Sequence, residues 1–200
     1  MTKILLIRHA TTDSVGKRLS GRTPGVHLNP EGQAQAQQLA QRLADSQITA
    51  IYSSPLERAV QTAEPIAEKL KLQTIIQEDF LEIDFGNWTN STFAELQPDP
   101  QFKLFNSFRS ATRIPGGELM LEAQARIVAG LQKLCLQHPQ ETVAIVSHSD
   151  LIKAAVAYYA GIHLDMFQRL EISPASVSVL QIFAETAQIL VVNHTGELNL

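Results

Sequence analysis

The sequence predicts an α/β fold: a three-layer sandwich with a mostly parallel central sheet, helices on both faces and a small inserted cap. Three apolar runs support this prediction, at residues 4–7, 48–52 and 142–147. The first run shows no alternation of apolar and polar residues, which indicates a strand buried on both faces, as in parallel sheets. Stretches with apolar residues at helical spacing lie between the runs, and the alternation of the two patterns is typical of this class.

The composition is that of one soluble domain. The chain has 200 residues, of which 44% are hydrophobic and 18% charged, both ordinary values for a globular protein. A net charge of −4 and a pI near 5.8 argue against broad nucleic-acid binding. Cys135 is the single cysteine, so an internal disulfide is excluded.

The sequence also suggests where the protein works. No apolar stretch approaches the roughly 20 residues of a membrane span. Met1 is followed almost at once by the first predicted strand, which leaves no room for a signal peptide. We therefore expect a cytoplasmic protein with no membrane and no nucleic-acid partner, and a homodimer is compatible with the sequence.

Two helices are predicted before residue 72. Asn29 and Pro30 suit the cap and first position of a helix. Ser54, followed by Pro55 and by Glu57 three residues after the serine, forms a capping-box pattern that predicts a helix start at Ser54. Pro65 lies inside this second pattern and should kink or break the helix.

The second half of the chain completes the pattern. Residues 72–76 are a short strand candidate, and residues 90–115 are expected to form a cap of short helices whose aromatic residues make its own small core. A helix is predicted from about residue 119, and another from Ser147 or Ser149 to about Tyr159. Residues 177–183 and 189–192 should form a final pair of strands. One domain over residues 1–200 accommodates all of these elements.

Four basic or imidazole side chains follow the predicted strands. Arg8 and His9 end the first strand, His148 follows the strand at 142–147, and Arg58 lies just after the strand at 48–52. The carboxyl ends of strands in open α/β sheets border the ligand crevice. Two arginines and two histidines gathered there suit a phosphoryl dianion.

The order of these motifs resembles the histidine phosphatase superfamily, the phosphoglycerate-mutase-like proteins, over nearly the whole chain. The resemblance implies a phosphohistidine intermediate on His9, with no metal and no cofactor. It also implies that Ser20 and Gly21 contact phosphate, because they match a pair in the loop after the first strand, and that Glu82 is the family's glutamate. Thr12 and Ser149 are further expected substrate contacts.

Phosphoryl transfer gives each of these residues a role. His9 can attack phosphorus if one ring nitrogen donates a hydrogen bond to a backbone carbonyl and the other is unprotonated. Arg8, Arg58 and His148 would bind the phosphate oxygens. A nearby phosphate should raise the pKa of Glu82, which then protonates the leaving alcohol and later activates water.

Three departures from the family pattern bear on function. Ala10 replaces the usual glycine after the first histidine, Ser149 and Asp150 follow the second, and Thr89 replaces an acidic residue. We expect a metal-independent hydrolase of small phosphate monoesters. A cofactor-dependent phosphomutase is the first alternative, and a catalytically silent phosphate-binding or interaction protein is the second.

Overall fold

The computed structural model describes residues 1–196, which form a six-stranded mixed sheet in the order β3-β2-β4-β1-β5-β6. The first four of these strands run parallel, and β5 and β6 are antiparallel to their neighbours. The strands span β1 Thr2–Arg8, β2 Ile48–Ser53, β3 Thr74–Ile76, β4 Thr142–Ser147, β5 Val177–Ile182 and β6 Ala187–His194. The prediction of a mostly parallel sheet with a final pair of strands is confirmed.

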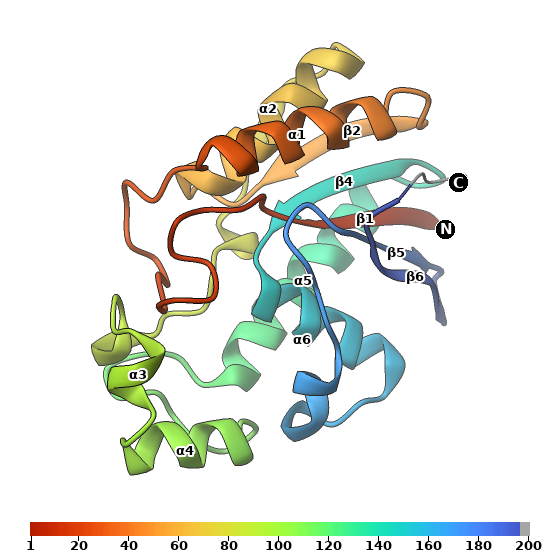
Figure 1. Cartoon of the computed structure of the whole chain (residues 1–200). Helices are drawn as coiled ribbons and strands as arrows, with labels where there is room; N and C mark the ends of the chain where they lie inside the picture. The colour runs from red at the N-terminus through yellow and green to blue at the C-terminus, as the bar shows by residue number, and fades with distance from the viewer. Residues whose placement is uncertain (197–200) are drawn as a thin grey trace.

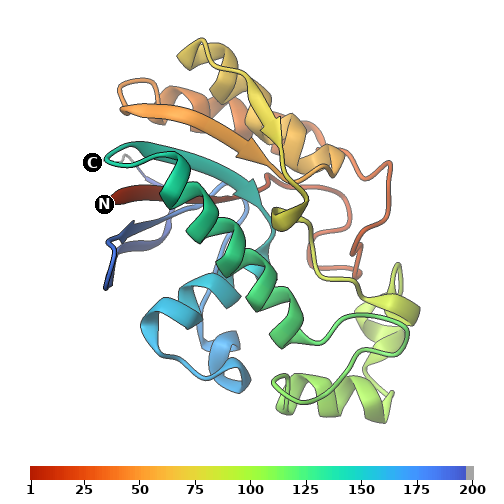
Figure 2. The same ribbon diagram turned by 180° about the vertical axis from the view of Figure 1, so that it is seen from behind.

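Helices cover both faces of the sheet (Figures 1 and 2). One face carries α1 (Pro30–Arg42) and α2 (Glu57–Leu70), and the other carries α5 (Met120–Gln137) and α6 (Ser149–Ala160). Side chains of β1 alternate between two cores: Leu5 and Ile7 belong to the core shared with α1 and α2, and Ile4 and Leu6 to the core shared with α5 and α6. Every apolar residue of the strand is therefore buried, which confirms the three-layer α/β prediction.

The strand register brings three chain segments to one edge of the sheet. Arg8 at the end of β1 pairs with Ser147 at the end of β4. Ser53 at the end of β2 pairs with Val146 on the other side of β4. The residues that come next, His9, Ser54 and His148, therefore emerge side by side.

The predicted start of α2 is wrong. The helix begins at Glu57, and its cap residue Leu56 makes no side-chain capping bond. Ser54 does not cap the helix because its N–H still donates to the Val146 carbonyl, as a continuation of β2, at 2.9 Å. Its hydroxyl lies 2.8 Å from Nε2 of His148. The expected break at Pro65 does not occur, since α2 continues to Leu70.

The predicted serine cap of α6 is also wrong. His148 is the cap residue, with extended backbone and no capping bond from its side chain. Ser147 instead donates its hydroxyl to the Phe80 carbonyl at 2.9 Å, and Ser149 is the first helical residue. His148 nevertheless lies at the helix N-terminus, as expected.

Two short helices, α3 (Phe93–Leu96) and α4 (Pro100–Ser107), lie in residues 90–115, which we call the cap segment. They stand away from the sheet beside the loop that follows β1 (Figure 1). Trp88 packs edge-on against Phe102 and Phe105, with ring centroids 5.3 and 5.5 Å apart. A single β-bridge between Arg18 and Thr92 joins the loop to the cap segment. The boundaries of a cap within one domain over residues 1–200 stay a prediction, and residues 197–200 lie outside the described part.

Short 3-10 helices complete the fold at Glu78–Phe80, Gly86–Trp88 and Leu164–Arg169. Over residues 1–196, none of the helices has the length and apolar character that crossing a bilayer requires.

Candidate active site

His9 is buried immediately after β1, with 6% of its surface exposed. Its Nδ1 lies 2.7 Å from the carbonyl oxygen of Ala10, which is the hydrogen bond expected of a nucleophilic histidine. A proton on Nδ1 leaves Nε2 with a free lone pair. Burial, followed by the charges of Arg58 and Arg8, holds the pKa of His9 well below its usual value, so the ring is neutral near pH 7.

Alanine at position 10 fits this backbone. Ala10 is fully buried and has no positive φ, so the site does not require glycine. Its N–H donates to the hydroxyl of Thr62, 3.0 Å away in α2. The departure from the family pattern at this position therefore leaves the geometry of the loop intact.

Arg8 and Arg58 place unpaired N–H donors in the site. Arg58 is 2% exposed; its Nη2 donates to the Gly21 carbonyl at 2.7 Å, while its Nη1 is buried with no partner among the described residues. Arg8 donates from Nη1 to the Ile172 carbonyl, and its Nε is likewise buried without a partner in residues 1–196. Buried donors without acceptors are unfavourable. Their presence indicates a site built for an anion.

His148 adds a third such donor. The side chain is fully buried, and its ring centroid is 5.3 Å from that of His9. Its Nε2 is bonded to the Ser54 hydroxyl, and its Nδ1 has no hydrogen-bond partner in the described part of the chain. Burial and nearby positive charge lower the pKa of His148. A neutral ring with the proton on Nδ1 would donate from the first turn of α6, where the helix dipole also favours an anion.

Glu82 lines the same cavity as His9, Arg8 and Arg58. Its Oε1 accepts a hydrogen bond from the Ile83 N–H at 2.9 Å, and its Oε2 is 4.0 Å from Nδ1 of His148. Burial, and then the charge of Asp150, raise the pKa of Glu82 to about 7, while Arg58 and Arg8 act in the opposite direction. The carboxyl group is thus partly protonated near neutral pH without the phosphate that the sequence argument invoked.

Two arginines that sequence reasoning missed hold the Glu82 backbone. Arg22 donates from Nε to the Glu82 carbonyl at 2.8 Å, and Arg126 donates from Nη1 to the Leu81 carbonyl at 2.7 Å. Glu118 accepts from both, at 2.8 Å from Arg22 and 3.1 Å from Arg126. Glu118 and Arg126 lie eight residues apart, just before and within α5, but Arg22 comes from the loop after β1, so no local pattern could have revealed the whole cluster.

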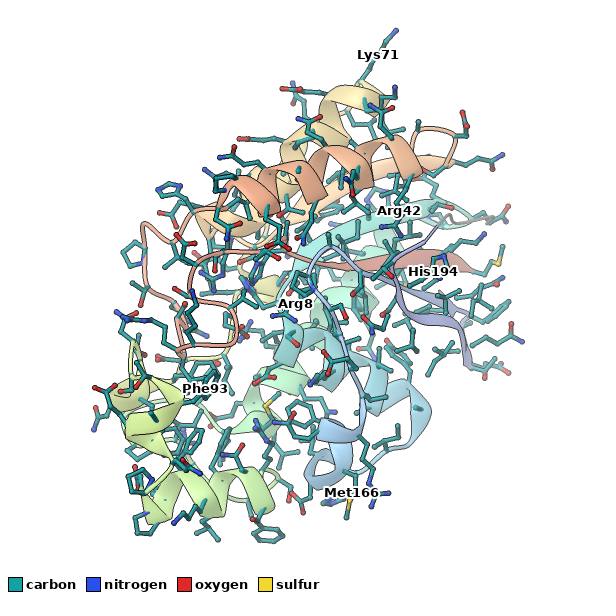
Figure 3. The ribbon with its side chains drawn as sticks, in the orientation of Figure 1. Arg8, Arg42, Lys71, Phe93, Met166 and His194 are labelled. Atoms are coloured by element: carbon teal, nitrogen blue, oxygen red, sulfur yellow. The ribbon has the colours of Figure 1, made fainter. Side chains whose placement is uncertain are left out.

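The site opens into a cavity of about 280 Å³. Figure 3 shows Arg8 at the end of the sheet nearest the cap segment, and Phe93 on that segment. The predicted substrate contacts Thr12, Ser20, Gly21 and Ser149 line the cavity, together with Arg8, His9, Arg58 and Glu82. The structure therefore brings the predicted site residues together, with His148 buried beside His9.

The cap segment contributes aromatic residues to the lining of the cavity, although these residues were expected to form the internal core of the cap. Phe93, Phe102 and Phe105 all line the cavity, and Phe93 is 41% exposed, so the expectation of a purely internal aromatic core is wrong in part. Phe105 fits both descriptions, because it is 1% exposed and packs on Trp88. Arg109, which sequence reasoning missed, also lines the cavity from this segment.

Asp150 does not turn away from the site. It lines the cavity, and its Oδ2 is 3.7 Å from Nη1 of Arg109. The sequence left the direction of this carboxylate open. Within residues 1–196, no group of three or more His, Cys, Asp or Glu side chains is arranged to hold a metal ion.

Residues 4–195 match the family model of the histidine phosphatase superfamily (branch 1). The chain belongs to this superfamily. The motif order that suggested the resemblance is therefore a true family pattern, carried here on the expected α/β fold.

Individual proteins match almost the whole of this chain. The bifunctional protein Rv2228c of Mycobacterium tuberculosis is 36% identical over 98% of this chain, and the matched region is about half (55%) of that protein. Phosphoserine phosphatase 1 of Hydrogenobacter thermophilus is 31% identical over 98% of this chain and 96% of its own length. A phosphoserine phosphatase mutant from Entamoeba histolytica, solved in complex with phosphoserine, superposes with a TM-score of 0.89 at 29% identity and covers 100% of both chains.

Proposed function

We propose that this member of the histidine phosphatase superfamily hydrolyses small phosphate monoesters through a phosphohistidine on His9. One observation carries the proposal: a buried, neutral His9 with Nε2 free lies among unpaired N–H donors of Arg8 and Arg58. Nucleophile and anion donors are the two parts that phosphoryl transfer requires. Relatives with phosphatase names support hydrolysis as the reaction class.

The first step forms the phosphoenzyme. The lone pair of His9 Nε2 attacks phosphorus, the N–P bond forms and the bond from phosphorus to the ester oxygen breaks. Protonated Glu82 gives its proton to the departing oxygen, so the alcohol leaves neutral. Arg8, Arg58 and His148 donate hydrogen bonds to the three oxygens that carry the transferred charge.

The second step returns the enzyme to its starting state. Glu82, now a carboxylate, takes a proton from a water molecule as the water oxygen attacks phosphorus. The N–P bond breaks, the electron pair returns to Nε2, and inorganic phosphate leaves. A pKa of about 7 suits this double use, because the group must give and take a proton at the same pH.

The phosphomutase alternative is less well supported. A mutase must hold its phosphoenzyme away from water until a second hydroxyl of an acidic substrate accepts the phosphoryl group. The Asp150 carboxylate lines the cavity beside the catalytic groups, and it opposes a substrate that carries several negative charges. The silent binding protein is disfavoured because His9, Arg8, Arg58 and Glu82 line one cavity, with His148 buried beside His9.

The test follows covalent label and product together. With p-nitrophenyl phosphate, we expect turnover that a chelator does not abolish. His9→Ala should lower turnover by about a thousandfold or more and remove acid-labile ³²P labelling, whereas His27→Ala, at an exposed position, should do neither. Full labelling of the His9→Ala protein would refute the nucleophile assignment.

The same enzyme preparation separates hydrolase from mutase. It is given 3-phosphoglycerate with a trace of 2,3-bisphosphoglycerate, and both isomerisation and free phosphate are followed. Isomerisation faster than phosphate release would establish the mutase. Neither product, with p-nitrophenyl phosphate still hydrolysed, would assign the enzyme to another monoester.

The proposed function also implies a location and a class of partner. We expect a cytoplasmic enzyme that acts on a small-molecule ester and has no nucleic-acid partner. A homodimer stays a prediction that size measurement in solution would check.

A further inference from the structure

Arg109 is a buried cation that the proposed chemistry does not use. It is 4% exposed, and its guanidinium lies between the rings of Phe105 and Phe167, at 4.4 and 4.7 Å from their centroids. Nη2 donates to the side-chain oxygen of Asn106 at 2.6 Å. Nε and Nη1 are buried with no hydrogen-bond acceptor among the described residues, although the side chain lines the catalytic cavity.

Asp150 is the anion closest to this cation. Its Oδ2 is 3.7 Å from Nη1 of Arg109, beyond hydrogen-bond distance, and the side chain is 20% exposed. In residues 1–196 it accepts no hydrogen bond from any side chain or backbone group. It also acts electrostatically on Glu82, Arg8 and Arg109, so it lies near both the catalytic groups and Arg109. Arg109 and Asp150 thus line one cavity close to each other, and Arg109 has N–H groups without a hydrogen-bond partner among the described residues.

We propose that Arg109 and Asp150 bind the two charged ends of an O-phosphorylated α-amino acid. Its carboxylate accepts a hydrogen bond from Nη1 of Arg109, the nitrogen on the Asp150 side, and its ammonium group donates to the Asp150 carboxylate. The assignment rests on the proposed function, since it places this pair beside the phosphoryl site of His9.

Charge balance selects a zwitterion over a simple acid. A carboxylate bound to Arg109 without an ammonium group would lie close to the Asp150 carboxylate and be repelled by it. An amine without a carboxylate would leave the buried donors of Arg109 unpaired. A substrate carrying both groups pairs each charge and leaves neither protein side chain unsatisfied.

The size of the cavity is consistent with this class. Its volume of about 280 Å³ is at the lower limit of ligand pockets, which are roughly 300–1,000 Å³. Phe93 and Phe102 close the side formed by the cap segment. A phosphorylated three-carbon amino acid is small enough for this space.

A matched substrate series tests the proposal. The series consists of O-phosphoserine with both groups, 3-phosphoglycerate with the carboxylate only, phosphoethanolamine with the amine only, and glycerol 3-phosphate with neither. p-Nitrophenyl phosphate reports the phosphoryl chemistry itself. We expect kcat/KM for O-phosphoserine to exceed each of the other alkyl phosphates by about tenfold or more, since each lost charged contact has an effect of this size.

Three variants assign the two groups. Arg109→Met keeps the apolar packing between Phe105 and Phe167, and it should lower the ratio of kcat/KM for O-phosphoserine to that for p-nitrophenyl phosphate by about tenfold to a hundredfold. Arg109→Lys should recover part of this ratio, because it restores the charge but not the planar fork. Asp150→Asn should lower the ratio of kcat/KM for O-phosphoserine to kcat/KM for 3-phosphoglycerate. The ammonium group of O-phosphoserine loses its partner, and the carboxylate of 3-phosphoglycerate is no longer repelled by Asp150.

Arg113→Met is the matched control, because Arg113 is in the same cap segment but is 53% exposed and paired with Glu122. It should leave all substrate ratios unchanged. Equal kcat/KM values across the substrate series would overturn the proposal. So would an Arg109→Met protein in which kcat/KM falls equally for every substrate, because Arg109 would then have a structural role. Failure of p-nitrophenyl phosphate hydrolysis in the unaltered enzyme would instead refute the underlying phosphatase function.

Discussion

Two carboxyl groups, those of Glu82 and Asp150, line one cavity and interact electrostatically. Glu82 is buried and near the charge of Asp150, which together raise its pKa to about 7. The Oδ2 atom of Asp150 is 3.7 Å from Nη1 of Arg109. A carboxyl group with a raised pKa in a cleft is a candidate general acid, and Asp150 contributes to the raised pKa of Glu82.

Asp150→Asn tests this coupling. Removal of the Asp150 charge should lower the pKa of Glu82 toward the ordinary carboxyl range, because Arg58, Arg8 and the Ile83 N–H then act with less opposition. The acid form of Glu82 is lost as pH rises through this pKa. The alkaline fall in kcat/KM for an alkyl phosphate should therefore move from near pH 7 to lower pH.

The measurement is a pH profile of kcat/KM for glycerol 3-phosphate, with p-nitrophenyl phosphate as a good leaving group that needs little protonation. Asp45→Asn, at an exposed position, serves as the control and should leave the profile in place. An unshifted alkaline limb in the Asp150→Asn protein would show that Asp150 does not set the protonation of Glu82.

At the scale of elements, the strands and the Asn29–Pro30 start of α1 were predictable, whereas the start of α2 and the cap of α6 were not. The apolar runs of β1, β2 and β4 end where the sheet ends, so the positions of Arg8, His9 and His148 followed from the sequence. The start of α2 did not, because Ser54 bonds to Val146 and His148, which are distant in sequence. The capping pattern allows Ser54 to cap a helix, but its bonds to Val146 and His148 hold it in another position.

The N-terminus of α1 provides an element-scale prediction. Asn29 donates its N–H to the Thr11 carbonyl at 3.2 Å, and its side chain caps the helix at the Gly32 N–H. A Cβ on Gly32 would overlap the Thr11 carbonyl oxygen. Gly32→Ala should therefore push α1 away from the loop that carries Thr12, and lower both Tm and kcat/KM, with a stability loss of about 1–3 kcal/mol.

The control for this variant is Gln33→Ala, one residue further along α1 at an exposed position. It should change Tm little, because alanine favours helix and removes no packing contact. Thermal unfolding followed by circular dichroism, with initial rates on p-nitrophenyl phosphate, measures both effects. If Gly32→Ala were as stable and active as the parent, the close approach of helix and loop would be irrelevant to the site.

Across the whole molecule, the site depends on segments that the sequence does not link. The catalytic histidines and arginines could be predicted because each adjoins a strand end or helix start. The roles of Arg109 and Arg22 could not, because their partners Asp150 and Glu118 are distant in sequence and no spacing records the contacts. The net charge of −4 gave no sign of the local excess of cations around His9.

These unpaired buried donors should make an anion stabilise the entire fold. Phosphate at 100 times its Kd adds about 2.7 kcal/mol to the free energy of unfolding. For a chain of this length, this corresponds to a rise in Tm of roughly 5–10 °C. Inorganic phosphate and vanadate should both raise Tm in differential scanning calorimetry, because both satisfy the free N–H groups of Arg58, Arg8 and His148.

Comparison of each protein with and without anion isolates this effect from any change in baseline stability. Arg58→Ala should lose most of the ligand-induced rise even if its Tm without phosphate is already lower. Arg113→Ala, on the exposed side of the cap segment, should keep the full rise. Sulfate at equal ionic strength controls for general salt effects, although it should bind the same donors more weakly if the site prefers a phosphate dianion. If Arg58→Ala kept the full rise in Tm, phosphate would bind elsewhere, and the unpaired Nη1 of Arg58 would not be one of its hydrogen-bond donors.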